Sequence, residues 1–407
     1  MSTQFNPPFA LQLTADESKL TQDLKSKIIA QIAAHGGCIP VSKYIELALY
    51  DHCYGYYNNL LHKFGVDGDF ITAPILSELF ALCLARQIRE LWHNSEVPPN
   101  VLEIGAGNGQ LMFDLLTNLG DLIGHYYILE LSASLASFQQ QELSTKYPQF
   151  LSKVTWLNAL PDNFDGIILA NEVLDAQPCE VVVWSEGNTE QRMVGVDKDG
   201  DLIYLTKPIC SDELNQIASL IRMSTKSSSI GIDVNIDIDK NPYISEINLN
   251  NRGFMKSLAG ALRHGFILLI DYGYCASEYY LPNRSNGTLR GYFRHRQLDD
   301  ILSYPGLIDI TSSIDFSAIA LTAIDNQLDF IGYTTQANFL LNCGLADIVA
   351  SQHGNIDDIK YLKLTNQVNY LTAPDEMGEV FKIIGFSKDI DFNDWMGFKR
   401  NDLSHTL

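Results

Sequence analysis

The chain has 407 residues, of which 46% are hydrophobic, and it carries 28 Lys and Arg against 49 Asp and Glu. This composition is too apolar for a disordered chain, and the length fits one large elaborated domain or two. The net charge of −21 argues against a surface built for nucleic acid or anionic lipid, so we expect no nucleic-acid partner and a basic or neutral ligand.

The cysteines and the apolar stretches indicate in which cellular environment the protein works. The seven cysteines are scattered, odd in number and never in a C-x-x-C pair, which indicates a reducing compartment without a disulfide framework or a metal site. Residues 1–20 lack the features of a signal or transit peptide. Apolar stretches such as 265–270 are far shorter than the ~20 residues that span a bilayer. The sequence therefore predicts a soluble, cytoplasmic protein without membrane insertion.

Residues 1–97 are predicted to form an N-terminal helical cap with an irregular loop. Apolar positions recur at helical spacing, and a stretch rich in glycine and aromatic residues follows the second helix. Ser42 is the expected N-cap of that second helix. The pattern predicts helices over about 15–34, 42–50 and 74–92.

From residue 98 to 180 short buried strands alternate with helices. Continuous apolar strands joined by helices are typical of a parallel, doubly wound sheet, so this segment is predicted as the first part of an α/β core. The expected strands lie at 100–104, 126–130, 154–156 and 165–170, and the expected helices at 109–119 and 135–147.

Residues 181–242 are predicted to form an inserted subdomain, with hairpin strands around 196–202 and an alternating stretch at 232–239. We read Asp197–Asp201 as an Asp-Gly hairpin turn, because the residues that a calcium loop needs further on are missing. The core resumes over 243–407, with a helix at 243–262 and a buried strand at 266–270.

Three glycines follow the first predicted core strand. Gly105, Gly107 and Gly109 stand in a G-x-G-x-G pattern between the strand at 100–104 and the next helix. Such a turn lets a ligand lie against bare backbone, beside the unpaired N–H groups of a helix start. A tight strand-to-helix turn without a ligand is the alternative reading.

Two neighbouring residues argue against a dinucleotide at this turn. Gln110 stands where a dinucleotide site has Gly or Ala, and the carboxylate of Glu103 would repel a pyrophosphate. The same carboxylate suits the amino group of S-adenosylmethionine, which carries no phosphate. We therefore predict S-adenosylmethionine as the cofactor.

Further acids are expected where other core strands end. Glu130, 21 residues after Gly109, can accept both hydroxyls of a ribose. Asn171 and Glu172 follow one later strand and Asp271 follows another. Because ligands bind beyond the carboxyl ends of parallel strands, these side chains are candidates for cofactor and substrate contacts. The alternatives are a surface glutamate for Glu130, a helix cap with its first turn for Asn171 and Glu172, and a plain loop cap for Asp271.

These motifs together resemble the class I S-adenosylmethionine methyltransferases and, more specifically, the mitochondrial dysfunction protein A family. The resemblance implies a Rossmann-like, mostly parallel, seven-stranded sheet. The mitochondrial members of that family are protein arginine methyltransferases that assist assembly of respiratory complex I. The chain departs from the family pattern at Ser313, where a histidine is expected. The resemblance is carried by the segments 68–74, 171–178, 271–273, 287–289, 309–316 and 377–382.

The resemblance also assigns residues. It implies that Asp69 and Thr72 close over the cofactor, that Leu131 packs along the adenosine, and that Asn171 positions the methionine end. The remaining expected cofactor contacts are Glu103, Gly105, Gly107, Gly109 and Glu130.

The chemistry of a guanidinium sets the catalytic candidates. The group is always charged at neutral pH, so a carboxylate has to orient it and localise its charge. Glu172 is the first choice for this clamp, with Asp271 or Asp175 second. The resemblance thus implies methylation of an arginine in a protein, with a complex I subunit or a bacterial counterpart as a candidate target. A cofactor-binding scaffold, a small-molecule methyltransferase and a dinucleotide-dependent oxidoreductase remain alternatives.

Overall fold

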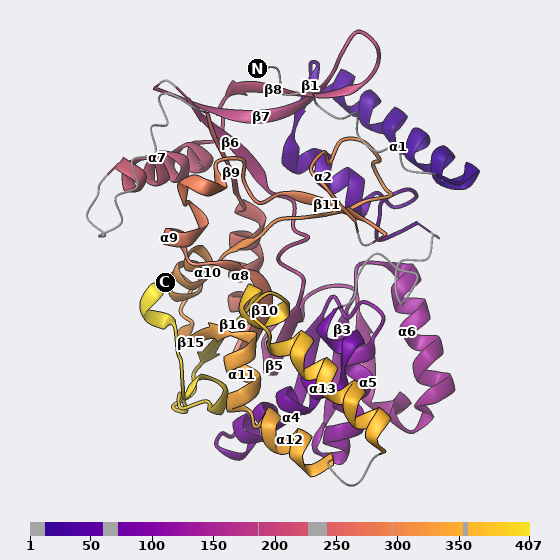
Figure 1. Ribbon diagram of the computed structural model, residues 1–407, viewed down its shortest axis with the longest axis vertical. Coiled ribbons are helices and arrows are strands. Elements are labelled where there is room, and N and C mark those ends of the chain that lie inside the picture. Colours follow the sequence, from indigo (N-terminus) through magenta and orange to yellow (C-terminus); the bar gives the residue numbers. More distant parts are fainter. Residues whose placement is uncertain (1–12, 60–71, 186, 227–241, 295, 353–356) are drawn as a thin grey trace.

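A computed structural model describes residues 13–59, 72–185, 187–226, 242–294, 296–352 and 357–407 (Figure 1). Its largest element is a sheet whose strands follow the order β15-β16-β10-β5-β2-β3-β4, with β14 (Ile314–Asp315) paired to β10. Strand β16 runs antiparallel to both neighbours, and the strand pairs that link β4, β3, β2, β5 and β10 are parallel. The predicted α/β fold with a mostly parallel sheet is confirmed. The strands are β2 (Asn100–Ile104), β3 (His125–Leu129), β4 (Val154–Leu157), β5 (Phe164–Asn171), β10 (Leu262–Tyr274), β15 (Asp329–Thr335) and β16 (Phe381–Lys388).

Helices cover both faces of this sheet because its central strands are apolar on both sides. In β10, Phe266, Leu268 and Ile270 join the core formed with α4 (Glu78–His93) and α5 (Gln110–Leu119). The alternate residues of the same strand pack with α8 and α10. The other helices of this body are α6 (Ala133–Lys146), α8 (Leu249–Ala261), α10 (Phe316–Asp325), α11 (Gln336–Asn342), α12 (Leu345–Gln352) and α13 (Asp358–Thr372).

A second, antiparallel sheet forms the upper part of the molecule in Figure 1, beside α1 (Ala15–Ala34), α2 (Val41–Tyr50) and α7 (Asp212–Lys226). Its strand order is β1-β7-β6-β9, with β8 on the other side of β7. The Asp197–Asp201 turn joins β7 to β8 as predicted. The strands are β1 (Cys38–Pro40), β6 (Glu180–Ser185), β7 (Asn188–Val196), β8 (Leu202–Pro208) and β9 (Tyr243–Ile247).

The structure differs from the expected elements in four places. Residues 38–40 form strand β1, so the N-terminal segment shares a sheet with the predicted insertion. Residues 243–247 pair with β6 as a strand, and the helix begins only at Leu249. The helix expected over 74–92 is divided at Ser77, which caps α4. Pro40, not Ser42, stands at the start of α2.

A small third sheet has the strand order β12-β11-β13 and contacts both the N-terminal helices and the cavity beside the large sheet. Its strands are β11 (Arg290–Phe293), β12 (Arg296–Leu298) and β13 (Asp309–Thr311), and Ile310 joins the core beneath α1 and α2. Short elements complete the fold: α3 (Ala73–Leu76), α9 (Ala276–Tyr279), α14 (Met377–Val380), and 3-10 turns at Gly120–Leu122, Pro148–Lys153, Pro282–Arg284, Met396–Phe398 and Ser404–Thr406.

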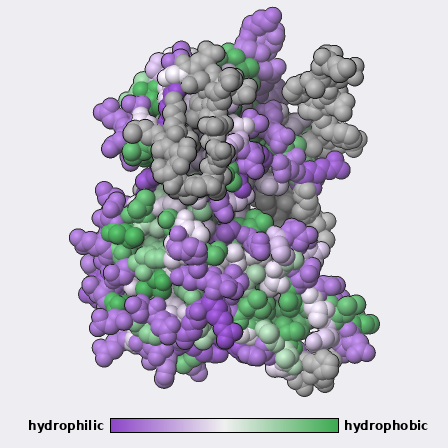
Figure 2. Space-filling model, turned by 60° about the vertical axis from the view of Figure 1, so that its left-hand side comes forward, coloured by the Kyte–Doolittle hydropathy of each residue, from purple (hydrophilic) through white to green (hydrophobic). Residues whose placement is uncertain are grey.

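Within the ranges given above, no helix is long and apolar enough to cross a membrane, and no group of three or more His, Cys, Asp or Glu is placed to hold a metal ion. Hydrophilic side chains are spread over the face shown in Figure 2, with apolar ones between them. The stretch at 232–239 and Asp69 lie outside the described residues. The predicted domain boundaries at 97, 180 and 242 remain predictions.

Candidate active site

A cavity of about 680 Å³ lies at the carboxyl ends of β2, β3 and β5. The first core strands form its floor, and residues 50–58, β11 and β13 contribute to its other side. Five acids line it, and the described lining residues include no Lys, Arg or His. Such a cavity favours cationic ligands because its own charges are of one sign. The acids are Glu103, Glu130, Glu172, Asp175 and Asp309.

The glycine turn forms one wall of the cavity. Gly105, Gly107 and Gly109 have φ of +66°, +57° and +81°, a region that favours glycine. A Cβ on Gly105 would stand 2.9 Å from Val173 Cγ2. Gly109 then precedes the first residue of α5. Gly105 and Gly107 line the cavity and Gly109 does not, so the predicted contact of Gly109 with the cofactor stays a prediction.

Two acids flank this turn. Glu103 is 3% exposed and accepts a hydrogen bond from the Tyr126 hydroxyl at 2.7 Å, and burial raises its pKa to about 7. Glu130 follows β3, and its Oε1 accepts the backbone N–H of Ser132 at 3.0 Å. Burial also raises the pKa of Glu130. Leu131 next to it lines the cavity with 76% of its surface exposed, which leaves an apolar face available to a ligand.

Gln139 of α6 ties the two halves of this wall together, and no sequence pattern pointed to it. Its amide nitrogen, Nε2, donates to the Gly107 carbonyl at 2.8 Å and to Glu130 Oε2 at 3.4 Å. Its Oε1 accepts the indole N–H of Trp156 at 2.8 Å. A polar residue on a helix reads as ordinary surface in a sequence, but here the side chain is fully buried.

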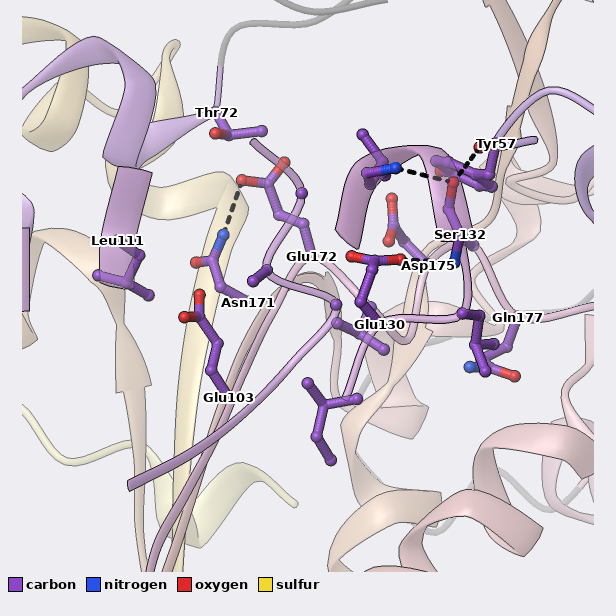
Figure 3. Close-up of a pocket in the computed structure, with 18 of the residues that line it drawn as sticks. Tyr57, Thr72, Glu103, Leu111, Glu130, Ser132, Asn171, Glu172, Asp175 and Gln177 are labelled. Carbon is purple, nitrogen blue, oxygen red and sulfur yellow. Dashed lines mark hydrogen bonds between the residues drawn. The ribbon is translucent and has the colours of Figure 1, made fainter. Parts of the chain in front are cut away.

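The turn after β5 brings two predicted residues into the cavity. Asn171 Nδ2 donates to Glu172 Oε1 at 3.1 Å (Figure 3), and Asn171 Oδ1 is buried with no hydrogen-bond partner among the described residues. Glu172 has φ +53°, a strained value for a residue with a side chain, and its N–H donates to the Ile270 carbonyl at 2.9 Å. Burial, followed by repulsion from Asp175, raises the pKa of Glu172 to about 8.

Asp175 and Asp271 have different positions. Asp175 is 7% exposed, lines the cavity, and has one carboxylate oxygen without a hydrogen-bond partner. Burial raises its pKa to about 6. Asp271 is fully buried and does not belong to the cavity lining, although the next residue of β10, Tyr272, does. Its carboxylate accepts the backbone N–H groups of Leu174 at 2.9 Å and Asp175 at 3.2 Å, so it holds the turn from behind.

Of the two residues expected from the N-terminal loop, Thr72 lines the cavity and Asp69 is outside the described residues. Ser313 does not line the cavity; its backbone N–H donates to Thr288 Oγ1 at 3.0 Å. The residue that departs from the family pattern therefore lies behind the wall of the site.

Several lining residues were not assigned from the sequence. The sequence resemblance includes Asp309 only as part of the segment 309–316 and assigns it no role. In the structure Asp309 lines the cavity, is 5% exposed, and its Oδ1 accepts a hydrogen bond from the Tyr57 hydroxyl at 3.1 Å. The carbonyl of Tyr57 accepts Ser132 Oγ at 2.7 Å (Figure 3). Tyr50, Tyr57 and Tyr292 give this side of the cavity an aromatic character.

The residues present fit S-adenosylmethionine. Three features face one cavity: the glycine turn, the carboxylate of Glu130 beyond β3, and the amide oxygen of Asn171, which has no partner among the described residues. An adenosyl amino acid needs close approach to the backbone and polar partners of this kind. The absence of a basic side chain from the described lining fits a ligand that carries a sulfonium and not a phosphate.

A family model described as "Putative S-adenosyl-L-methionine-dependent methyltransferase" matches residues 83–334. The chain belongs to this family. The methyltransferase is also similar to the crystal structure of a protein from Burkholderia thailandensis bound to S-adenosyl-homocysteine, with 36% identity and a TM-score of 0.87 over 98% of this chain and 100% of the other. The predicted family, the enzyme class and the S-adenosylmethionine cofactor are confirmed.

Curated relatives are more distant. The zebrafish (Danio rerio) protein arginine methyltransferase NDUFAF7, mitochondrial, is 26% identical over 89% of this chain and 85% of its own length. The Caenorhabditis elegans homolog is 26% identical over 80% of this chain and 77% of its own length. Both names are mitochondrial, so the prediction of a cytoplasmic protein is wrong; it rested on residues 1–20 and the cysteine pattern, neither of which reports location in a family of this kind.

Proposed function

We propose that this methyltransferase transfers a methyl group to a guanidinium nitrogen of an arginine side chain in a protein. The observation that carries the proposal is the cluster of Glu172, Asp175 and Asp309 around one cavity, with no basic residue in the described lining. The names of the relatives support the same acceptor, since they are called protein arginine methyltransferases. The chain's net charge of −21 also favours a basic protein partner.

The proposed cofactor contacts follow from the walls of the cavity. Gly105 and Gly107 would admit the ligand to the backbone, Glu130 would accept the ribose hydroxyls, and Leu131 would pack on the adenosine. Glu103 and Asn171 are the proposed contacts of the methionine end. Thr72 lines the cavity and is proposed to close over the cofactor. The roles of Gly109 and Asp69 stay predictions from the sequence. S-adenosylmethionine supplies an electrophilic methyl group at this position.

Glu172 is the proposed acceptor-binding carboxylate. A guanidinium has pKa above ~12, so it enters as a cation and its nitrogens become competent only when oriented in line with the methyl group. The ionised form of Glu172 can hold two N–H groups of the guanidinium at once. Asn171 fixes Oε1 by donating to it, and Asp271 fixes the turn behind both residues. In this proposal Asp175 adds charge, and Asp271 acts through the turn.

The test is to incubate the purified protein with methyl-labelled S-adenosylmethionine and extract from cells that lack this chain, and to identify labelled species by mass spectrometry. We expect label on arginine in one or a few proteins, and loss of that label with Glu172→Gln. Label only in the small-molecule fraction would replace the proposal with small-molecule methylation. Cofactor binding without any labelled product would favour an assembly or scaffold role.

A further inference from the structure

The wall of the cavity opposite the core strands is built by the small sheet. Tyr292 of β11 and Asp309 of β13 are directly paired across this antiparallel sheet. Directly opposed residues in such a pair project to the same face, and both of these line the cavity. The small sheet therefore presents a carboxylate and a phenol as neighbours toward the site.

The core contributes acids to the same space. Glu172 and Asp175 come from the turn after β5, and Asp175 Oδ1 is a buried acceptor without a hydrogen-bond partner in the part of the chain that the structure describes. A buried acceptor without a partner is costly, and acids of like charge around one cavity repel each other. Both costs fall when a cation with several N–H donors enters between the walls.

Tyr57 links Asp309 to the proposed cofactor wall. Its hydroxyl donates to Asp309 Oδ1 at 3.1 Å, and its carbonyl accepts Ser132 Oγ at 2.7 Å. Ser132 in turn donates its N–H to Glu130. The Tyr57 ring is fixed by stacking on Tyr50, with 5.4 Å between ring centroids.

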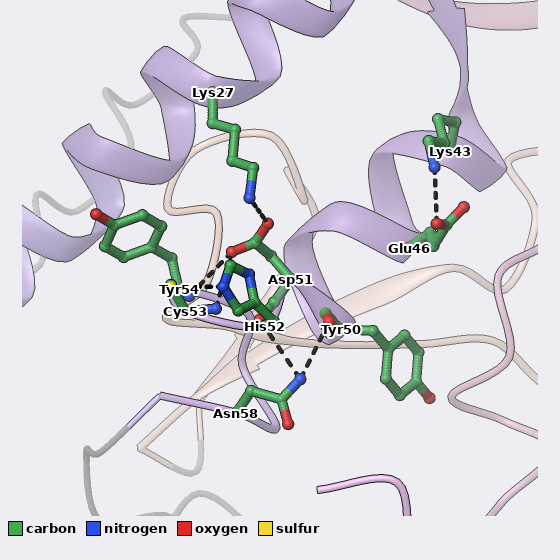
Figure 4. Close-up of polar contacts among 9 residues, drawn as sticks. All are labelled: Lys27, Lys43, Glu46, Tyr50, Asp51, His52, Cys53, Tyr54 and Asn58. Atoms are coloured by element: carbon green, nitrogen blue, oxygen red, sulfur yellow. Dashed lines mark hydrogen bonds and ion pairs between the residues drawn. The ribbon is translucent and has the colours of Figure 1, made fainter.

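The turn that carries Tyr57 is itself rigidly held (Figure 4). Asp51 Oδ1 accepts the N–H groups of Cys53 and Tyr54, both at 3.1 Å, and its other oxygen pairs with Lys27. Asn58 Nδ2 donates to the Tyr50 carbonyl at 3.0 Å. These bonds hold the backbone on both sides of Tyr57, and its hydroxyl bonds Asp309.

We propose that Asp309 is a second acceptor-binding carboxylate opposite Glu172, and that Tyr57 is the positioning residue that directs it. Two carboxylates on opposite walls select a planar cation with donors on more than one edge, which is a guanidinium and not the compact ammonium of lysine. This inference rests on the proposed function and adds the residues that discriminate between the two cationic side chains.

The experiment measures acceptor binding without transfer. Three probes, the Nα-acetyl amides of arginine, lysine and citrulline, are titrated into protein saturated with S-adenosyl-homocysteine, and heats of binding are recorded. We expect the wild type to prefer the arginine probe. Asp309→Asn should lower the affinity for the arginine probe by about tenfold or more and remove the preference for it, because a charge-assisted hydrogen bond is lost. Tyr57→Phe should lower the affinity for the arginine probe by about threefold to tenfold.

Matched controls separate this role from a structural one. Asp299→Asn changes an aspartate whose side chain is 90% exposed, and Tyr54→Phe changes a tyrosine of the same turn that does not line the cavity. Both should leave probe binding unchanged. All four variants should keep the wild-type affinity for S-adenosyl-homocysteine, and Tyr57→Phe should raise KM for the acceptor more than it lowers kcat.

Equal binding of the three probes by the wild type, or an unchanged arginine preference in Asp309→Asn, would overturn the inference. These results differ from failure of the proposed function. Arginine labelling that persists at wild-type level in Asp309→Asn removes Asp309 while arginine methylation stands. The other combination is loss of the arginine preference in Asp309→Asn together with methyl label on a residue other than arginine. It would support the cation-binding role of Asp309 and contradict arginine methylation.

Discussion

The carboxylate of Asp271 accepts a hydrogen bond from the backbone N–H of Leu174 at 2.9 Å, although 97 residues separate the two in the chain. The same oxygen accepts the N–H of Asp175 at 3.2 Å. The turn held in this way begins at Glu172, whose φ of +53° has to be stabilised by its surroundings. A residue that never reaches the cavity thus sets the geometry of the residues that do.

Replacing Asp271 tests this support. In Asp271→Asn an amide of the same shape replaces the carboxylate, and one orientation turns an NH₂ group toward backbone N–H groups. We expect the free energy of unfolding to fall by about 1 to 3 kcal/mol and methyl transfer to fall with it. Urea denaturation and a transfer assay measure the two effects. Asp329→Asn, at an exposed position on β15, is the control, and equal stability of the two variants would contradict the assigned role.

The glycine turn gives a second prediction. Gly107 lines the cavity with φ +57°, and Gly120, at the end of α5, has φ +54° with no atom near its Cβ position. Valine at either place is strained, because β-branched L residues rarely adopt a positive φ. Gly107→Val should also lose affinity for S-adenosyl-homocysteine by about a hundredfold or more, since the side chain enters the proposed ligand space.

Calorimetric titration and thermal unfolding of the two valine variants separate strain from blocked binding. Gly120→Val should bind S-adenosyl-homocysteine with wild-type affinity. Wild-type affinity in a folded Gly107→Val would remove this turn from the cofactor site.

The parts of the fold that sequence reasoning predicted are those whose signal is local. Strands β2, β3 and β5 are short apolar runs bounded by turns, and both of their faces are buried, so composition alone identifies them. The glycine turn was recognised for the same reason, because strand, turn and helix start lie within eleven consecutive residues, 101–111. Glu103 and Gln110 then indicated the cofactor, and the family resemblance agreed with it.

What sequence reasoning missed depends on distant contacts. Tyr57 and Asp309 are 252 residues apart, and nothing in either segment indicates that they meet. Residues 243–247 were expected to be helical because they precede a helix, but pairing with β6 fixes them as a strand. Asp271 was expected at the rim because the apolar run ends at Ile270, whereas pairing with β16 extends β10 beyond it. In each case tertiary pairing overrides the local pattern.

The Lys27 and Asp51 pair gives a third prediction. Burial raises the pKa of Asp51, but hydrogen bonds from Lys27 and from the N–H groups of Cys53 and Tyr54 outweigh it, and the pKa lies below its ordinary value. A lowered folded-state pKa stabilises the protein above the unfolded value near ~3.9, and this stabilisation is lost as the pH falls through the lower folded value. The Lys27 side chain is 38% exposed, so solvent screens part of the effect.

Lys27→Met should therefore cost about 1 kcal/mol or less at pH 7. The difference from the wild type should shrink as the solution is acidified toward pH 2. Urea denaturation over this range measures it, with Lys43→Met as the control, because Lys43 pairs with the exposed Glu46 within one helix. A constant difference at all pH values would show that packing of the Lys27 chain, and not its charge, stabilises the turn.

Glu172 gives a prediction of opposite sign. Burial comes first among the causes that raise its pKa to about 8, against about 4.3 for an unfolded chain. Between these two values the folded state binds more protons than the unfolded state, so ionisation of Glu172 lowers stability as the pH rises through this window. Glu172→Gln cannot ionise, so its stability relative to the wild type should increase from pH 5 to pH 9.

Transfer should respond to the same ionisation in the other direction. A guanidinium needs the charged carboxylate, so the wild-type rate should fall about tenfold for each pH unit below the pKa of Glu172, while Glu172→Gln should be inactive and bind S-adenosyl-homocysteine normally. Saturating acceptor should shift the apparent pKa downward, because a bound cation favours the ionised form. Parallel stability curves for the two proteins, together with a flat rate profile between pH 6 and pH 9, would mean that Glu172 is ionised throughout and that its environment is more polar than its burial implies.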